Sequence, residues 1–355
     1  MDQRIEKLAD ILVNHSIKVK KGEKVAIEGQ TQAKELMLAV YVKVLEAGGF
    51  PYINADFSET RYLLLKTASD EQLDHFPEHD EFNSRYFDSF IKIGAPENTR
   101  QLSSIDSGKI AKRMAITRKI SNYIVDNKKW VITMFPTNAQ AVEADMSLEE
   151  YEDFVYSSTN IDWSEQSRYQ DKIKDLFDNH DIVEIKDNDT DLRFSIKDRT
   201  GNKCDGGFNM PDGEVFYAPV KDTVEGHIRF TYPGIRDGKE ITNIYLEFEK
   251  GRVVKATADK NEELLKKLIE TDEGSHYIGE FGIGTNFGIK RYVKNLLFDE
   301  KIGGTIHLAL GKAYKEGGGK NESALHYDIV KDLRNSGEII VDGKTVQKNG
   351  KWVFE

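Results

Sequence analysis

The stretch KVAIEGQTQAKELMLAVYVKVLEAGGFPYINA, residues 24–55, decides the fold of the first part of the chain. It opens with Lys24–Gly29, a short apolar segment typical of a strand that ends at glycine. Residues 33–47 are good helix formers closed by Gly48-Gly49, and a second strand-like segment follows at residues 50–55. Strand, helix and strand joined by short connections predict a parallel crossover.

Two further strand-like segments, Phe87–Gly94 and Lys129–Pro136, extend this rhythm. Together they predict an open α/β sheet, largely parallel and flanked by helices. The segment Gly29–Ala33 has neither the GxGxxG spacing of a dinucleotide site nor the GxxxxGK[ST] of a phosphate loop. We therefore assign no nucleotide to this domain, and a nucleotide-dependent dehydrogenase is disfavoured.

The pattern changes near residue 180. Ser147 and Glu150 form a capping-box sequence that opens a largely helical stretch, which runs to Phe177 with a break near Asp162. From Ile182 onward short strands separated by turn residues dominate. The sequence thus predicts an N-terminal open α/β domain, residues 1–180, and a C-terminal mixed α+β domain, residues 181–355.

Composition narrows the class of protein. Of the 355 residues, 39% are hydrophobic and 31% are charged, a composition typical of globular proteins. The net charge of −11 disfavours nucleic-acid and phosphoester partners. No apolar run approaches the roughly 20 residues of a membrane helix, and the first residues lack the apolar core of a signal peptide. A single cysteine, Cys204, excludes internal disulfides and fits a reducing compartment. We expect a cytoplasmic protein without a membrane partner.

Groups that could bind metal concentrate in the C-terminal part. Thr305–Leu310 reads as a buried strand, and His307 within it is costly unless it is hydrogen-bonded or metallated. If His326-Tyr327-Asp328 is extended, His326 and Asp328 project from one face and form a chelating pair. Taken singly, each residue also has a structural interpretation, such as a hydrogen-bonded core histidine.

Two upstream carboxylates complete the set. Glu214 follows a turn in which proline and glycine fix the backbone, although a solvated glutamate is the simpler interpretation. Glu280 lies in Gly279–Asn286, whose three glycines in six residues exclude a stable helix interior. We expect there a loop that approaches a ligand closely, with a purely structural loop as the alternative. His227, which begins an alternating strand, is expected to be a packed or surface residue.

Imidazole and carboxylate without thiolate suit a hydrolytic divalent metal and argue against iron–sulfur or cysteine-bound structural zinc. Two imidazoles and several carboxylates can hold one or two divalent ions that activate a water. The HExxH helix motif is absent, which excludes a thermolysin-like site.

An ordered set of long motifs carries a resemblance. The motifs include Met210–Phe216, Gly279–Asn286, Leu297–Gly311 and Gly318–Ala324, and the likeness extends over nearly the whole chain. At these motifs the chain resembles the thermophilic metalloaminopeptidase family, the aminopeptidase T and aminopeptidase S type. The resemblance implies an N-terminal α/β domain that shapes a cavity and a homodimer, and a C-terminal catalytic domain that binds metal.

The same resemblance implies release of N-terminal amino acids from peptides with a free N-terminus, by water activated at two divalent ions. Zinc, cobalt, manganese and magnesium are the candidate ions. The side chains implied as metal ligands are Glu214, Glu280, His307, His326 and Asp328.

Within that set Glu280 would bridge the ions, and Glu280 or Glu214 would take the water's proton. Tyr314 would donate to the tetrahedral oxyanion, and Glu300 would be a ligand or a neighbour of the ligands. Two other functions stay open: a non-catalytic protein that binds metal or peptide, and a metallohydrolase that acts on a different amide or on a phosphoester.

Overall fold

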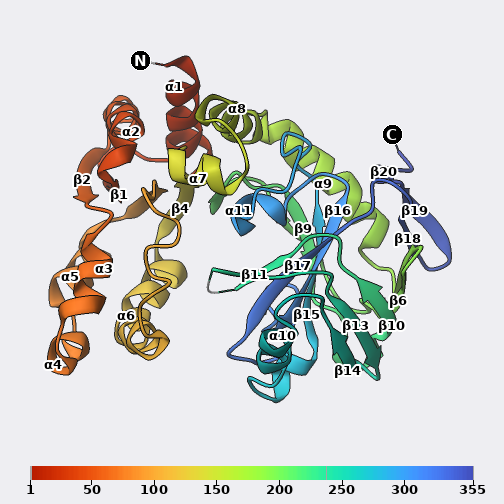
Figure 1. The fold of residues 1–355 in the computed structure, drawn as a ribbon. Helices are drawn as coiled ribbons and strands as arrows, with labels where there is room; N and C mark the ends of the chain where they lie inside the picture. Colours follow the sequence, from red (N-terminus) through yellow and green to blue (C-terminus); the bar gives the residue numbers. More distant parts are fainter. Residues whose placement is uncertain (1, 237, 355) are drawn as a thin grey trace. The chain divides into compact units, whose positions relative to one another are not determined.

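The computed structural model describes residues 2–236 and 238–354, which form a mixed α/β fold with parallel and antiparallel sheets (Figure 1). The chain folds as two compact units. The first comprises the residues up to Asn160 with Gly206–Pro211, and the second comprises Ile161–Asp205 with the residues from Asp212 onward. Sequence pattern places the change near residue 180, whereas helix α9 (Trp163–Phe177) packs on strands of the second unit. The separate roles of the two domains remain predictions.

The first unit is built on one parallel sheet with the strand order β2-β1-β3-β4-β8. Its strands are β1 (Lys24–Gln30), β2 (Phe50–Asp56), β3 (Ser89–Gly94), β4 (Lys129–Met134) and β8 (Asn209–Met210). Helix α2 (Lys34–Glu46) connects β1 to its parallel neighbour β2, so the predicted crossover is confirmed. The predicted open, largely parallel α/β sheet is likewise confirmed.

The remaining helices of this unit are α1 (Gln3–Asp10), α3 (Thr60–Thr67), α4 (Asp70–Asp74), α5 (Glu78–Tyr86), α6 (Ser107–Asn127), α7 (Asn138–Glu143) and α8 (Leu148–Thr159). Helix α8 begins at the predicted capping box. Ser147 Oγ accepts from the Glu150 amide at 3.2 Å, and Glu150 Oε2 accepts from the Ser147 amide at 2.8 Å. Of the described helices, none combines the length and the apolar character needed to cross a membrane.

The second unit contains two larger antiparallel sheets. The eight-stranded sheet has the order β14-β13-β10-β6-β5-β18-β19-β20. Its strands are β5 (Ile182–Asp187), β6 (Thr190–Ser195), β10 (Glu225–Arg229), β13 (Tyr245–Glu249), β14 (Arg252–Thr257), β18 (Glu338–Val341), β19 (Lys344–Lys348) and β20 (Lys351–Trp352).

The five-stranded sheet has the order β17-β16-β15-β9-β7. Its strands are β7 (Asn202–Cys204), β9 (Glu214–Tyr217), β15 (Ile278–Gly284), β16 (Thr305–Gly311) and β17 (His326–Asp332). The unit also contains α10 (Glu262–Ile269), α11 (Leu296–Asp299), the short 3-10 helices at Lys221–Thr223 and Glu273–His276, and the hairpin of β11 (Gly234–Arg236) with β12 (Lys239–Ile241).

The apolar faces of these two sheets share one core. Phe194 of β6 lies 5.0 Å from Phe281 of β15 between ring centroids, and Phe177 of helix α9 lies 6.2 Å from the same ring. Burial of each such ring stabilises the fold by about 1.5–3 kcal/mol. A slip of one residue in strand register would replace Phe281 by a neighbour such as Glu280, so the core fixes which face carries polar groups.

Candidate metal centre

The polar face of the five-stranded sheet carries every predicted metal ligand. Because neighbouring strand residues point to opposite faces, the core residues Val215, Phe281, Leu308 and Tyr327 leave their neighbours on the other side of the sheet. Those neighbours are Glu214 on β9, Glu280 on β15, His307 on β16, and His326 and Asp328 on β17. The antiparallel ladder then brings the four strands side by side.

The side chains form two groups that share Glu280. His307 Nε2 lies 3.1 Å from Glu280 Oε1 and 3.3 Å from Glu214 Oε2. His326 Nε2 lies 3.4 Å from Asp328 Oδ2 and 3.8 Å from Glu280 Oε2. The two oxygens of Glu280 therefore face different histidines, and the carboxylate stands between a Glu214/His307 group and a His326/Asp328 group.

Backbone carbonyl groups orient both imidazoles. His307 Nδ1 lies 3.0 Å from the Glu300 carbonyl oxygen, and His326 Nδ1 lies 2.9 Å from the Lys312 carbonyl oxygen. A carbonyl oxygen only accepts, so each Nδ1 carries the hydrogen and donates. In neutral rings the Nε2 lone pairs then point at the carboxylates, which is the arrangement of histidines that ligate metals.

Gly282 makes room for the His307 ring. The two residues are paired across β15 and β16, and a Cβ on Gly282 would lie 2.0 Å from His307 Nε2. This corrects the expected loop at residues 279–286, because Ile278–Gly284 is a fully buried central strand. The glycine accommodates a neighbouring side chain of the protein itself. Gly213, with φ +120°, sits directly before Glu214 and likewise lacks space for a Cβ, 2.6 Å from Asn286 Cβ.

A buried lysine neutralises part of the carboxylate charge. Lys301 is fully buried, contacts the Glu300 carboxylate and lies 3.6 Å from Glu214 Oε1. Burial would lower its pKa, but the charges of Glu214, Glu300 and Asp212 raise it well above its ordinary value. This ammonium therefore stays charged. Lys301 could not be predicted as part of the site, because the charged run Asp299-Glu300-Lys301 is typical of a solvated surface turn.

The carboxylates and imidazoles perturb each other strongly. Burial, reinforced by the charges of Glu300 and Glu280, raises the pKa of Glu214 to about 8 against the opposing effect of Lys301 and His307. Burial lowers the pKa of His307, but the Glu280 hydrogen bond and the charge of Glu214 outweigh it and raise the pKa to about 10. The same balance, with Asp328 as partner, raises the pKa of His326 to about 9. Large pKa shifts in several neighbouring buried groups are typical of functional sites.

The donor set fits a divalent cation. Among the described residues, Glu214 Oε2, Glu280 Oε2 and Asp328 Oδ1 are buried and take part in no hydrogen bond. Buried carboxylate oxygens without donors are costly, and a cation would satisfy them. Potential ligand atoms of Glu214, Glu280 and His307 lie within 4.8 Å of one another, as do those of Glu300, His307 and Asp328. Because Glu300 belongs to the second group, its role as a metal ligand stays a prediction.

Tyr314 lies at the edge of this cluster, in the segment between β16 and β17. Its ring centroid is 5.2 Å from that of His326 and 5.7 Å from that of Phe216. Burial, with the charges of Glu280 and Asp328, raises its pKa, so the hydroxyl keeps its proton and can donate. Its side chain is 43% exposed, which leaves it accessible to a ligand.

Gln170 of helix α9 makes hydrogen bonds next to the cluster, and no sequence pattern predicts this role. Its Nε2 donates to the carbonyl oxygens of Cys204 at 2.8 Å and Glu214 at 3.2 Å. It also lies 3.1 Å from Thr285 Oγ1. This fully buried amide therefore links the end of β7, the start of β9 and the residue that follows β15. His227, by contrast, pairs with Asp191 and Glu247 in the other sheet, as a strand residue away from the ligands.

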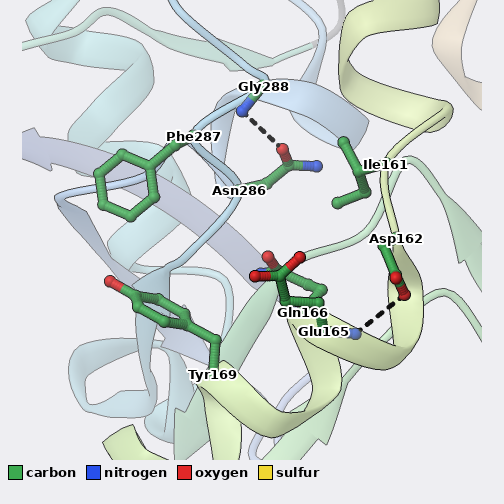
Figure 2. Close-up of a pocket in the computed structure, with 8 residues that line it drawn as sticks. All are labelled: Ile161, Asp162, Glu165, Gln166, Tyr169, Asn286, Phe287 and Gly288. Atoms are coloured by element: carbon green, nitrogen blue, oxygen red, sulfur yellow. Dashed lines mark hydrogen bonds between the residues drawn. The ribbon is translucent and has the colours of Figure 1, made fainter.

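Two cavities belong to this unit. One, of about 80 Å³, borders the cluster and includes His326 and Asp328 in its lining, together with Ile235, Tyr292 and Leu296. The other, of about 250 Å³, lies between the start of helix α9 and the segment after β15 (Figure 2). In the second cavity the Asp162 carboxylate accepts from the Glu165 amide, and none of the predicted ligands lines it.

Two known aminopeptidases are similar to the chain over nearly its full length. The chain is 28% identical to aminopeptidase AmpS of Bacillus subtilis strain 168, with 99% of each chain covered. It is 26% identical to aminopeptidase 2 of Geobacillus stearothermophilus, with 100% of this chain and 98% of the relative covered.

Solved structures show the same fold. AmpT from Thermus thermophilus superposes with a TM-score of 0.86 at 23% identity, over 99% of each chain. A 2,5-dihydroxypyridine dioxygenase from Pseudomonas putida KT2440 gives a TM-score of 0.62 at 13% identity, over 100% of this chain and 98% of that one. A fold shared by proteins with such different names does not by itself determine activity. Residues 1–355 match the family described as thermophilic metalloprotease (M29), and the chain belongs to that family of metal-dependent enzymes.

Proposed function

We propose that this protein is a metal-dependent aminopeptidase that releases the N-terminal residue of peptides with a free N-terminus, using two divalent ions. The observation that carries the proposal is the position of Glu280. Its two oxygens face His307 and His326 separately, and each histidine is accompanied by a further carboxylate, Glu214 or Asp328. A carboxylate so placed is suited to bridge two ions, which in other two-metal hydrolases lie about 3.5–4 Å apart.

Charge supports two ions. Four carboxylates, Glu214, Glu280, Glu300 and Asp328, act on the two histidines, and the ammonium of Lys301 lies beside them. With both imidazoles neutral these groups carry three excess negative charges, more than one divalent ion would neutralise. Burial of that charge without counter-ions would be strongly unfavourable.

In this proposal Glu214, Glu280, His307, His326 and Asp328 hold the ions. When bound, the ions would supply Lewis acidity and a water of lowered pKa. Glu280 or Glu214 accepts the proton of the attacking water and returns it to the leaving amine as the peptide bond breaks. Tyr314, whose hydroxyl keeps its proton, donates to the oxyanion of the tetrahedral intermediate. The names of the full-length relatives favour peptides over other amides as substrates.

Chelation and reconstitution test the proposal. Protein stripped of metal should not hydrolyse leucine p-nitroanilide, and zinc, cobalt, manganese or magnesium should restore activity to different extents. Elemental analysis should find about two ions per chain. Glu280→Gln and His326→Ala should stay folded by circular dichroism and lose metal or turnover. The matched control is His227→Ala, a histidine in the other sheet of the same unit, which should retain both. Undiminished hydrolysis after complete metal removal would reject the mechanism.

Two further predictions belong to the same proposal: a cytoplasmic location and a homodimer whose N-terminal domains shape the cavity. Sedimentation analysis of the purified protein between about 1 and 50 μM tests the dimer. A protein that is monomeric at every concentration in this range and fully active would contradict the predicted dimer. A non-catalytic protein that binds peptides would instead show metal content and peptide binding without turnover.

A further inference from the structure

The small cavity beside the metal cluster has a mixed polar and apolar lining. His326 and Asp328 line it together with Arg236 and Asp299, and its apolar lining includes Ile235, Tyr292 and Leu296. Ile235 is 36% and Leu296 46% exposed, so both residues offer apolar surface that the fold itself does not cover. A cavity with apolar side chains and a few polar groups beside a catalytic centre is a typical substrate subsite.

Its walls are held in place by contacts outside the cluster. Tyr292 stacks on Tyr232 with ring centroids 4.8 Å apart and an interplanar angle of 4°, and its hydroxyl donates to the Pro233 carbonyl oxygen at 2.8 Å. The segment that carries Leu296 is tied by Asp299 Oδ1, which accepts from the Val293 amide at 2.7 Å. The cavity is therefore preformed and does not depend on a ligand for its shape.

We propose that this cavity receives the side chain of the substrate's N-terminal residue and selects short aliphatic side chains, with Leu296 and Ile235 setting the size limit. The proposal rests on the proposed aminopeptidase function, because an N-terminal residue held at the His326/Asp328 end has its side chain beside these walls. Its volume of about 80 Å³ is roughly half that of the engineered apolar cavity of about 150 Å³ that holds benzene, so the cavity favours side chains smaller than an aromatic ring.

Size also decides against basic side chains. Arg236 lines the cavity together with Asp299 and Asp328, so charge does not exclude lysine or arginine, but both side chains are longer than those of alanine and valine. Asp299 is 2% exposed and its carboxylate already accepts a backbone hydrogen bond, so it offers little to a basic ligand. Alanine and valine are accordingly preferred over phenylalanine, tryptophan and arginine.

The test compares kcat/KM for the p-nitroanilides of alanine, valine, phenylalanine and arginine in the metal-loaded protein and in Leu296→Ala. One or two methylenes in such a pocket change discrimination by about 10- to 200-fold. The Phe/Ala ratio should rise at least about 10-fold in Leu296→Ala, while metal content stays unchanged. Val254→Ala removes a side chain of similar exposure, 49%, on β14 and should leave the ratio as in the wild type.

A binding measurement separates this inference from the proposed function. Calorimetric titration with free L-valine and L-phenylalanine should show the same preference, and Leu296→Ala should shift it towards phenylalanine. If no p-nitroanilide is cleaved but this binding preference appears and shifts, the aminopeptidase proposal fails and the subsite stands. If cleavage is normal but neither the kinetic nor the binding ratio changes in Leu296→Ala, the subsite is elsewhere.

Discussion

Replacing Gly282 by alanine places a methyl group against the His307 ring. The new Cβ would lie 2.0 Å from both Nε2 and Cε1, whereas Cβ contacts below 3.0 Å essentially never occur, so the ring must move by at least 1.0 Å. The ring has little freedom, because it is fully buried and Nδ1 is bonded to the Glu300 carbonyl oxygen. Overpacking of this kind lowers the free energy of unfolding by about 1–3 kcal/mol.

The functional effect should be larger than the effect on stability. A displacement of about 1 Å at a reacting centre can cost 10²-fold in rate, so kcat/KM for leucine p-nitroanilide should fall about 100-fold in Gly282→Ala. Metal content measured by elemental analysis should fall below that of the wild type. Gly207→Ala, at a glycine with nothing within 4 Å of the new methyl group, is the matched control and should be neutral.

A double-mutant cycle attributes the effect to the ring itself. In a His307→Ala background the methyl group of Gly282→Ala meets empty space, so its cost in urea unfolding should nearly vanish. The coupling energy should then equal most of the cost measured in the wild type. Full metal content and normal kcat/KM in Gly282→Ala, or an undiminished stability cost without the imidazole, would refute the packing argument.

The remaining predictions concern the supports of the cluster. Lys301→Met removes the ammonium beside the buried carboxylates of Glu214 and Glu300 and should lower the free energy of unfolding of metal-free protein by about 3–5 kcal/mol, partly recovered when divalent ions are added. Gln170→Leu removes the donor from buried carbonyl groups, so it should lower the free energy of unfolding in urea by about 1–3 kcal/mol. It should also weaken metal binding, measured by competition with a chelator. Burial opposes ionisation of Asp187, but Lys331, with Nζ 2.7 Å from Oδ2, and Ser336 outweigh it and lower its pKa. Its stabilising contribution is thus present above about pH 4 and lost as pH falls through the lowered pKa, so the deficit of Lys331→Met should shrink in unfolding curves below pH 4.

Much of the fold follows from local pattern. Apolar residues followed by a helix and a second apolar segment predicted the parallel unit of β1, α2 and β2 (Figure 1), and the capping box predicted the start of α8. These features depend on residues that are close in the sequence, so they can be predicted from a single sequence. The order of strands within a sheet depends on contacts far apart in sequence. For that reason the place of β8 at the edge of the first sheet was not predicted.

The ligand residues could be selected because imidazole in an apolar strand and alternation along His326-Tyr327-Asp328 carry a chemical signal of their own. The supports could not be selected. Lys301 looks like surface charge until the fold buries it, and Gln170 lies on a helix whose buried face is known only from the structure. The glycine pattern around Gly282 predicts a loop, because its cross-strand partner His307, which explains the glycine, is 25 positions away in the sequence.

Anomalous X-ray diffraction from metal-loaded crystals tests whether Glu280 would bridge two ions. We expect two anomalous peaks per chain, one beside His307 Nε2 and Glu214, the other beside His326 Nε2 and Asp328, each also within bonding distance of one Glu280 oxygen. A single peak in an active crystal form, or two peaks of which either lacks Glu280 as a ligand, would contradict it.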